Sequence, residues 1–199
     1  MKEKNILYTL VKAICYPFFM LLYHPKIVGK ENIIQEPLII CGNHKKPLDV
    51  FLLASSTRRK LHFFSKIELF NSKFKSSFFR KLGCIPVNRK EKNKEALIEG
   101  YECLNNSKTV VIFPEGTTNK TNEVLLLPFK FGAVKMSLET TKKILPFAIV
   151  GNYKIIGKSV KIIFGKPYNL ETSNLEEENE KLMKKVIKLI EENSDEKRK

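Results

Sequence analysis

The segment Asn43–Asp49, with the sequence NHKKPLD, combines a histidine and a carboxylate at a spacing that suits proton transfer. The apolar run Leu38–Ile40 before it predicts a buried strand, and a proline followed by the periodic run Val50–Ala54 predicts a helix. His44 is therefore expected in a strand-to-helix turn, with Asp49 about one helical turn beyond. There the Asp49 carboxylate reaches one ring nitrogen of His44 and leaves the other to take a proton from a hydroxyl.

Taken alone, this pair also has a purely structural explanation. An aspartate near a helix start often only complements the helix dipole and the free N–H groups there, and a lone turn histidine is usually a surface residue. Two further segments favour the catalytic interpretation: Gly83–Arg89, with the sequence GCIPVNR, and Val110–Thr117, with the sequence VVIFPEGT.

In this order, the three segments resemble the conserved blocks of the glycerolipid acyltransferase family, whose members acylate lysophosphatidic acid. NHKKPLD is similar to the family's NH-x4-D block, GCIPVNR to its glycine-to-arginine block, and FPEGT to its third block. Ile144–Phe147, a proline within an apolar strand, resembles the fourth. The resemblance covers roughly residues 28–168 and implies one α/β domain with helices around a central sheet.

The resemblance implies acyl transfer from a thioester, either acyl-CoA or an acyl carrier protein thioester, to the sn-2 hydroxyl of 1-acyl-glycerol 3-phosphate. His44 would be the general base, and Asp49 would fix its tautomer and stabilise the imidazolium. The sequence has no G-x-S-x-G nucleophile elbow, which favours direct attack by the hydroxyl. The reaction needs no metal or redox cofactor, so the thioester is the co-substrate. The acceptor-binding residues would be Arg89, Lys90, Glu115, Gly116, Thr117 and Asn43, and Pro146 would shape the acyl pocket.

Each binding residue also has a structural alternative. Arg89 suits phosphate oxygens with its planar fork, but exposed arginines are common. Glu115 can accept hydrogen bonds from the glycerol part, brace Arg89, or brace the histidine turn, and Pro-Glu-Gly by itself is a polar turn. Pro146 can be a strand-edge proline. Two departures from the family pattern, Thr118 in place of a frequent arginine and Lys46 in place of a frequent serine, leave the acceptor head group open.

The charge distribution points to an anionic partner. The 199-residue chain carries a net charge of +15 and is 43% hydrophobic, which suits one globular domain. The stretch Ser56–Lys94 holds twelve Lys or Arg against two Glu, with six of the fourteen phenylalanines. Cations mixed with large apolar side chains suit an anionic membrane surface. Nucleic acid is the rival partner, but the sequence has no helix-turn-helix, zinc-finger or RNP-type motif, so we do not expect it.

The stretch Ile6–Tyr23 is apolar, but Thr9, Lys12 and Pro17 interrupt it. Its length is near the lower limit for crossing a bilayer. We favour a monotopic helix lying in the membrane face, an element that the family often carries, over a helix packed on the protein's own core. This divides the chain into a membrane-associating segment, residues 1–26, and a catalytic domain, residues 27–199.

The remaining pattern alternates strands with helices and predicts an α/β sandwich with a mixed, mostly parallel sheet. Glu68–Leu82 is predicted as one helix, whose Phe70, Phe74 and Phe78 are expected to pack in the core more than to meet lipid. An amphipathic helix is predicted over about residues 174–192.

The sequence thus predicts a lysophosphatidic acid acyltransferase on the cytoplasmic face of the cell membrane. The alternatives are a family member with another lysophospholipid or glycerol 3-phosphate as acceptor and a basic, non-enzymatic membrane- or nucleic-acid-binding protein.

Overall fold

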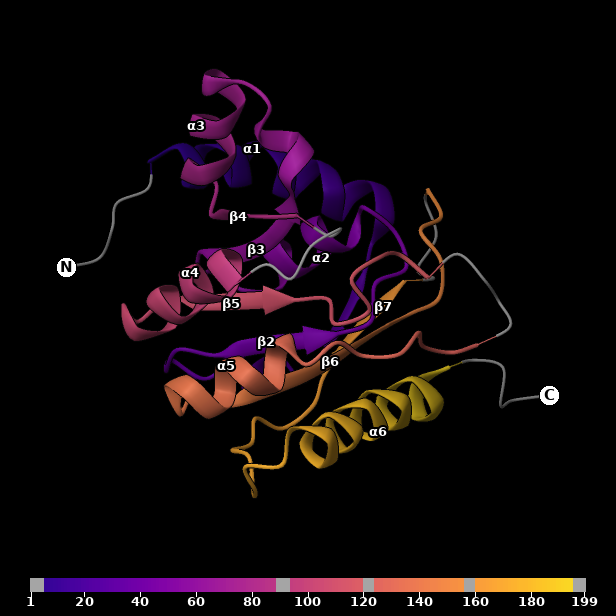
Figure 1. Ribbon diagram of the computed structural model, residues 1–199. Helices are drawn as coiled ribbons and strands as arrows, with labels where there is room; N and C mark the ends of the chain where they lie inside the picture. The colour runs from indigo at the N-terminus through magenta and orange to yellow at the C-terminus, as the bar shows by residue number, and fades with distance from the viewer. Residues whose placement is uncertain (1–5, 89–93, 120–123, 156–159, 195–199) are drawn as a thin grey trace.

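Short β-branched runs alternate with longer helices, and the strands join a single sheet (Figure 1). The computed structural model describes residues 6–88, 94–119, 124–155 and 160–194. Its strands are β1 (Lys26–Val28), β2 (Ile39–Gly42), β3 (Leu61–Lys66), β4 (Cys84–Val87), β5 (Thr109–Ile112), β6 (Ile144–Val150) and β7 (Lys161–Phe164). Its helices are α1 (Ile6–Tyr23), α2 (Asp49–Ser56), α3 (Lys73–Lys81), α4 (Lys94–Asn105), α5 (Gly132–Thr140) and α6 (Leu175–Asn193), with 3-10 turns at Lys30–Asn32 and Ile67–Phe70.

The sheet of the described residues has seven strands in the order β1-β7-β6-β2-β5-β3-β4. Every neighbouring pair is parallel except β6 and β7, which are antiparallel. The predicted mixed, mostly parallel α/β sheet is confirmed. Because β2 lies between β5 and β6, the segments that follow β2 and β5 leave the sheet at the same edge.

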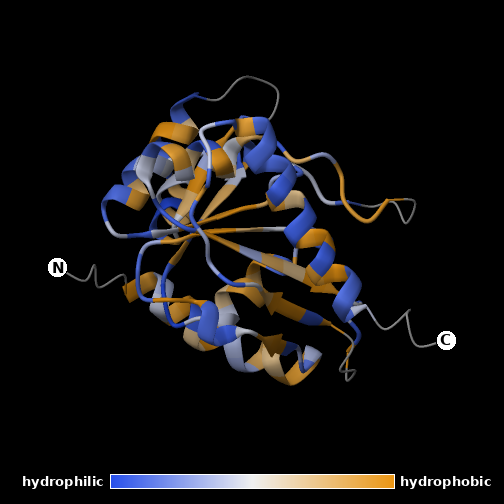
Figure 2. Cartoon of the chain, turned by 90° about the horizontal axis from the view of Figure 1, so that it is seen from below, coloured by the Kyte–Doolittle hydropathy of each residue, from blue (hydrophilic) through white to orange (hydrophobic). Residues whose placement is uncertain are grey.

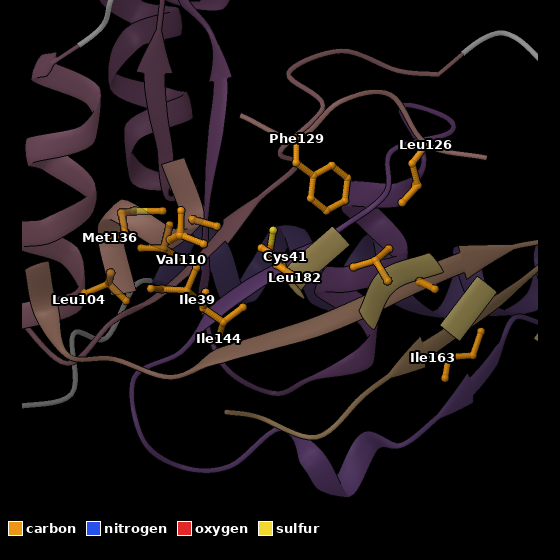
Figure 3. Close-up of a cluster of buried hydrophobic side chains, with 14 of the residues drawn as sticks. Ile39, Cys41, Leu104, Val110, Leu126, Phe129, Met136, Ile144, Ile163 and Leu182 are labelled. Atoms are coloured by element: carbon orange, nitrogen blue, oxygen red, sulfur yellow. The ribbon is translucent and has the colours of Figure 1, made fainter. Parts of the chain in front are cut away.

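Two hydrophobic clusters cover the two faces of the sheet, and β2 contributes to both. Ile39 and Cys41 point into the cluster that includes residues of α4, α5 and α6, whereas Leu38 and Ile40 point into the cluster that includes residues of α1 and α2. This alternation is the period-two pattern of a strand buried on both faces. Figure 2 shows apolar residues gathered on the sheet, and Figure 3 shows the first cluster.

The N-terminal helix α1 contacts the body along one side and exposes apolar residues on the other. Phe19 is buried in the cluster that α2 also joins, and the Tyr8 hydroxyl and the Lys12 ammonium donate to the carbonyl oxygens of Arg59 and Thr57. The exposed apolar side chains of α1 are Ile6, Leu10, Ile14, Tyr16, Phe18, Leu21 and Leu22. By length and composition alone this helix is able to cross a membrane, which is weak evidence in a helix near the N-terminus.

The expectation of one helix over Glu68–Leu82 is wrong. A 3-10 turn ends at Phe70, and α3 begins at Lys73, because Ser72 adopts an extended conformation and caps α3 by accepting from the Lys75 N–H. The break removes the common face of the predicted phenylalanine stripe. The Phe74 side chain is 82% exposed rather than packed in the core.

The predicted C-terminal amphipathic helix is confirmed as α6. Its Leu182, Val186 and Ile190 are buried in the cluster shared with α4 and α5, while its charged residues form ion pairs on the outer side. The end of α6 therefore lies close to the end of β6, at the edge of the sheet where the histidine turn is found.

Candidate active site

The histidine turn begins where β2 ends against β6. A Cβ atom on Gly42 would lie 2.1 Å from the Phe147 carbonyl oxygen, so only glycine fits this close approach. Asn43 follows and is buried. Its side-chain amide donates to the Ile149 carbonyl oxygen at 2.9 Å and accepts from the Ile149 N–H at 2.7 Å. These two bonds fix the start of the turn on β6.

His44 and Asp49 form the predicted pair. The Nδ1 atom of His44 lies 2.9 Å from the Oδ2 atom of Asp49, at the first residue of α2. The imidazole stacks on the ring of Phe113 with a centroid distance of 4.0 Å and an interplanar angle of 19°. Among the described residues, Nε2 of His44 has no hydrogen-bond partner, and the ring lines a cleft.

The carboxylate of Asp49 is fully buried, and it accepts every hydrogen bond that it makes with the described residues. Oδ2 accepts from the backbone N–H groups of Lys45 at 2.7 Å and Lys46 at 2.8 Å as well as from His44. Oδ1 accepts from the Tyr153 hydroxyl at 2.6 Å. Backbone N–H groups cannot accept, so this set fits an ionised carboxylate. The proton of His44 then sits on Nδ1, which leaves the lone pair on Nε2 of a ring that lines the cleft.

Glu115 holds the histidine turn through a hydrogen bond to its backbone. Its Oε1 accepts from the His44 N–H at 2.9 Å, and its Oε2 accepts from the Leu127 N–H at 2.8 Å. The His44 carbonyl oxygen accepts from the Asn119 N–H at 2.8 Å, so both backbone polar groups of His44 are bound to the segment after β5. Burial raises the pKa of Glu115 above its ordinary value, against the lowering effect of these two N–H groups.

The cleft in front of His44 has a volume of about 1420 Å³. It is larger than most pockets for small ligands, which are roughly 300–1,000 Å³. Its lining includes both apolar and cationic side chains. The apolar residues include Phe63, Phe64, Leu69, Phe113, Val124 and Leu125, and the cationic ones in the described ranges are Lys45, Lys46, Lys66 and Lys154. A ligand with a hydrocarbon part and an anionic part matches this lining.

A family model described as "Acyltransferase" matches residues 24–150, which is more than half of the chain. This chain belongs to the acyltransferase family. This member of the family carries a histidine–aspartate pair at the carboxyl ends of its parallel strands. The predicted family is confirmed.

Among curated relatives, the acyltransferase is 30% identical over 127 residues to the 1-acyl-sn-glycerol-3-phosphate acyltransferase of Saccharomyces cerevisiae. The match covers 62% of this chain and 42% of that protein. It is 29% identical over 148 residues to the protein of the same name in Bacillus subtilis, covering 71% of this chain and 72% of the relative. The crystal structure of the 1-acyl-sn-glycerophosphate (LPA) acyltransferase PlsC from Thermotoga maritima has the same fold. Its TM-score is 0.75 at 24% identity, with 96% of this chain and 83% of that chain covered.

The predicted binding residues of the acyltransferase fall into three groups. Arg89 and Lys90 lie outside the described residues. Gly116, with a positive φ of 71°, turns the chain after Glu115, and Thr117 lines the cleft. Asn43 also lines the cleft, although its amide is bound to β6. The acceptor-binding roles of all these residues remain predictions.

Pro146 lies at the centre of the sheet rather than at its edge. It is buried in β6 opposite Cys41 of β2, and its carbonyl oxygen accepts from the Gly165 N–H at 2.8 Å. The described lining of the cleft does not include Pro146, so a role in the acyl pocket draws no support from the geometry.

The site roles of two residues, Phe113 and Tyr153, were not predicted from the sequence. Phe113 is the first letter of FPEGT and follows β5, the strand next to β2, so the topology brings it to His44. Tyr153 is 104 residues from Asp49 and belongs to no recognised block, so nothing in the sequence pointed to it.

Proposed function

We propose that this acyltransferase transfers a fatty acyl group from acyl-CoA or an acyl carrier protein thioester to the sn-2 hydroxyl of 1-acyl-glycerol 3-phosphate. The product is phosphatidic acid, a precursor in phospholipid synthesis. The observation that carries the proposal is the imidazole of His44, which lines a cleft with apolar and cationic side chains while its Nδ1 is held by Asp49.

The reaction needs one base and no covalent enzyme intermediate. Nε2 of His44 takes the proton of the acceptor hydroxyl as its oxygen attacks the thioester carbonyl carbon. A C–O bond forms and a tetrahedral oxyanion results. The C–S bond then breaks, and the imidazolium returns the proton to the leaving thiolate. Asp49 stabilises the imidazolium throughout, because its carboxylate contacts Nδ1 and is fixed by backbone N–H groups.

The mixed lining of the cleft suits the two halves of the acceptor. The apolar side chains would cover an acyl chain, and the lysines carry the charge that a phosphate monoester would meet. We assign Arg89, Lys90 and the turn Glu115–Thr117 to acceptor binding on the strength of the family blocks. Glu115 would act mainly by holding His44, since both of its oxygens already accept backbone N–H groups.

We also propose that the enzyme acts at the cytoplasmic face of the cell membrane. The exposed apolar side of α1 suits a monotopic helix, and the +15 net charge favours anionic lipid. Residues 1–26 would form the membrane-associating segment and residues 27–199 the catalytic domain. A lysophospholipid that stays in the membrane could then enter the cleft without crossing water.

A related acceptor is the second candidate, and two residues of the cleft favour it. Lys46 and Thr118 both line the cleft and both depart from the family pattern. An added ammonium group at one position and a hydroxyl at the other change the charge that the head group meets. Another lysophospholipid, or glycerol 3-phosphate, is the alternative acceptor.

The test is an acyl-transfer assay in mixed micelles with wild type beside His44→Ala. The donors are acyl-CoA and acyl carrier protein thioester, and the acceptors are lysophosphatidic acid, glycerol 3-phosphate and a zwitterionic lysophospholipid. Product from lysophosphatidic acid with wild type alone is expected. Product from a different acceptor moves the substrate within the family. Folded, lipid-bound wild type that yields no product with any pairing contradicts the proposal.

A further inference from the structure

The two oxygens of the Asp49 carboxylate are held in different ways. Oδ2 accepts from His44, Lys45 and Lys46, all within the same turn. Oδ1 has one partner among the described residues, the Tyr153 hydroxyl at 2.6 Å. Tyr153 arrives from the segment after β6, where Gly151 turns the chain with a φ of 77°. This hydroxyl is therefore the contact that ties the catalytic carboxylate to a distant part of the fold.

The ring of Tyr153 rests on α1. It packs edge-on against Tyr23 at a centroid distance of 5.6 Å and an interplanar angle of 87°, and against Phe19 at 6.3 Å. Phe19 and Tyr23 are themselves 5.2 Å apart, and Phe19 stacks on Phe51 of α2 at 6.4 Å. An aromatic cluster thus joins the last turns of α1 to the helix that begins with Asp49.

From this arrangement we propose that Tyr153 is a positioning residue for the His44–Asp49 pair and that α1 holds it in place. The proposal rests on the acyl transfer proposed above, because its effect is read through that reaction. The hydroxyl fixes the rotation of the Asp49 carboxylate and takes part of its negative charge. The ring orientation needed for this bond depends on Tyr23 and Phe19. The helix with the exposed apolar side is therefore also the support of the catalytic pair.

The ionisation of Tyr153 is consistent with a donor role. Burial, together with the negative charge of Asp49, raises the pKa of the Tyr153 phenol well above its ordinary value, so the hydroxyl keeps its proton over the working range. The other titratable groups near the pair are Glu115 below the turn, Tyr23 behind the ring, and the ammonium groups of Lys45, Lys46 and Lys154 around the cleft.

The first test is Tyr153→Phe, which keeps the ring and removes the hydroxyl. We expect kcat to fall roughly tenfold to a hundredfold, as for loss of a hydrogen bond to a charged group, with the KM for acceptor little changed. Without the hydrogen bond from Tyr153, more of the negative charge of Asp49 acts on His44 and favours its imidazolium form. The acid limb of the pH–rate profile should therefore move to higher pH. Tyr8→Phe is the matched control. It also removes one tyrosine hydroxyl, which joins α1 to the Arg59 carbonyl oxygen and does not contact the pair, so neither kcat nor the profile should move.

The second test is a double-mutant cycle of Tyr23→Leu with Tyr153→Phe. Tyr23→Leu should lower kcat in the wild-type background and have little further effect once the Tyr153 hydroxyl is gone. Equal effects in both backgrounds would overturn the link to α1. An unchanged acid limb in Tyr153→Phe, whatever its kcat, would overturn the positioning role. A wild type without acyl transfer would instead refute the proposed function, so the two failures are distinguishable.

Discussion

Each end of the parallel strands holds a histidine among cations, and the partner of the ring atom Nδ1 differs between the two ends. At the carboxyl ends, Nδ1 of His44 donates to the Asp49 carboxylate, and the ring faces the large cleft. At the amino ends, Nδ1 of His62 on β3 donates to the Thr109 carbonyl oxygen at 3.2 Å. The ring there lines a cavity of about 310 Å³ with Lys60, Arg80, Lys81 and Lys108.

The comparison separates orientation from charge. A backbone carbonyl and a carboxylate both fix the tautomer of an imidazole, but only the carboxylate supplies the negative charge that stabilises an imidazolium. Glu99 lines the cavity near His62, yet its carboxylate pairs with Arg80 at 3.0 Å. His44 differs in that its Nδ1 is paired with a buried carboxylate and its ring lines the large cleft.

The largest expected effect breaks this contrast directly. His44→Ala should lower kcat by ~10²–10⁴-fold, the usual contribution of a general base. His62→Asn keeps a donor near the position of Nδ1, so its kcat should stay within a few-fold of wild type. Initial rates of thiol release measure both variants, and thermal unfolding checks that each is folded. Equal losses in the two variants would remove the distinction between the two ends.

The next effect tests the charge rather than the base. Asp49→Asn keeps an acceptor for the backbone N–H groups of the turn but removes the negative charge. We expect a loss of kcat about tenfold smaller than that of His44→Ala. Without the carboxylate the imidazolium is less favoured, so the acid limb of the pH–rate profile should move to lower pH, opposite to Tyr153→Phe. Full pH–rate profiles of the two variants measure this shift. A shift in the same direction for both would contradict the proposed roles of the Asp49 charge and the Tyr153 hydroxyl.

A third variant tests the support beneath the turn. Each oxygen of Glu115 accepts a backbone N–H, and glutamine offers only one such acceptor. Glu115→Gln should therefore lower kcat by about tenfold, because the backbone N–H of either His44 or Leu127 would then face the amide NH₂ group, which is itself a donor. It should also change the pH dependence of stability, because burial raises the pKa of Glu115 above 4.5 in the folded protein.

The sign follows from the raised pKa. The stability that Glu115 contributes as an acid is complete below 4.5 and is lost as pH rises through the folded pKa. The free energy of unfolding of wild type minus that of Glu115→Gln should therefore fall as pH rises from 4.5 toward neutrality. Urea unfolding at several pH values measures the difference. A difference that grows with pH would mean that the two N–H bonds outweigh burial.

Local spacing made the histidine turn predictable, because His44 and Asp49 lie on one short strand-to-helix connection and reach each other through it. The alternation of strands and helices likewise predicted the mixed sheet. The contact of Tyr153 with Asp49 was not predictable from the sequence. It depends on where the chain leaves β6 before it returns as the antiparallel strand β7. Sequence chemistry suggested three roles for Glu115, and the fold selects the bracing contact through the neighbouring positions of β2 and β5.

The misread helix has a local cause. The spacing of Phe70, Phe74 and Phe78 fits a continuous helix, but Ser72 caps a new one and turns Phe74 outward. A side-chain oxygen that accepts an N–H near a helix start competes with helix continuation, and periodicity alone does not register it. The prediction that Phe74 packs in the core is therefore wrong, because the side chain is exposed.

The smallest expected effect concerns this exposed ring. If α3 meets the lipid surface, Phe74→Ser should weaken binding to anionic vesicles about three- to tenfold, because part of one aromatic side chain no longer enters the interface. The kcat measured in micelles and the unfolding temperature should stay close to wild type, since Phe74 touches neither the core nor the cleft. Leu138→Ser, an exposed apolar residue of α5, is the matched control. Vesicle co-sedimentation measures both, and equal losses would mean that exposure alone, rather than the position of α3, governs lipid binding.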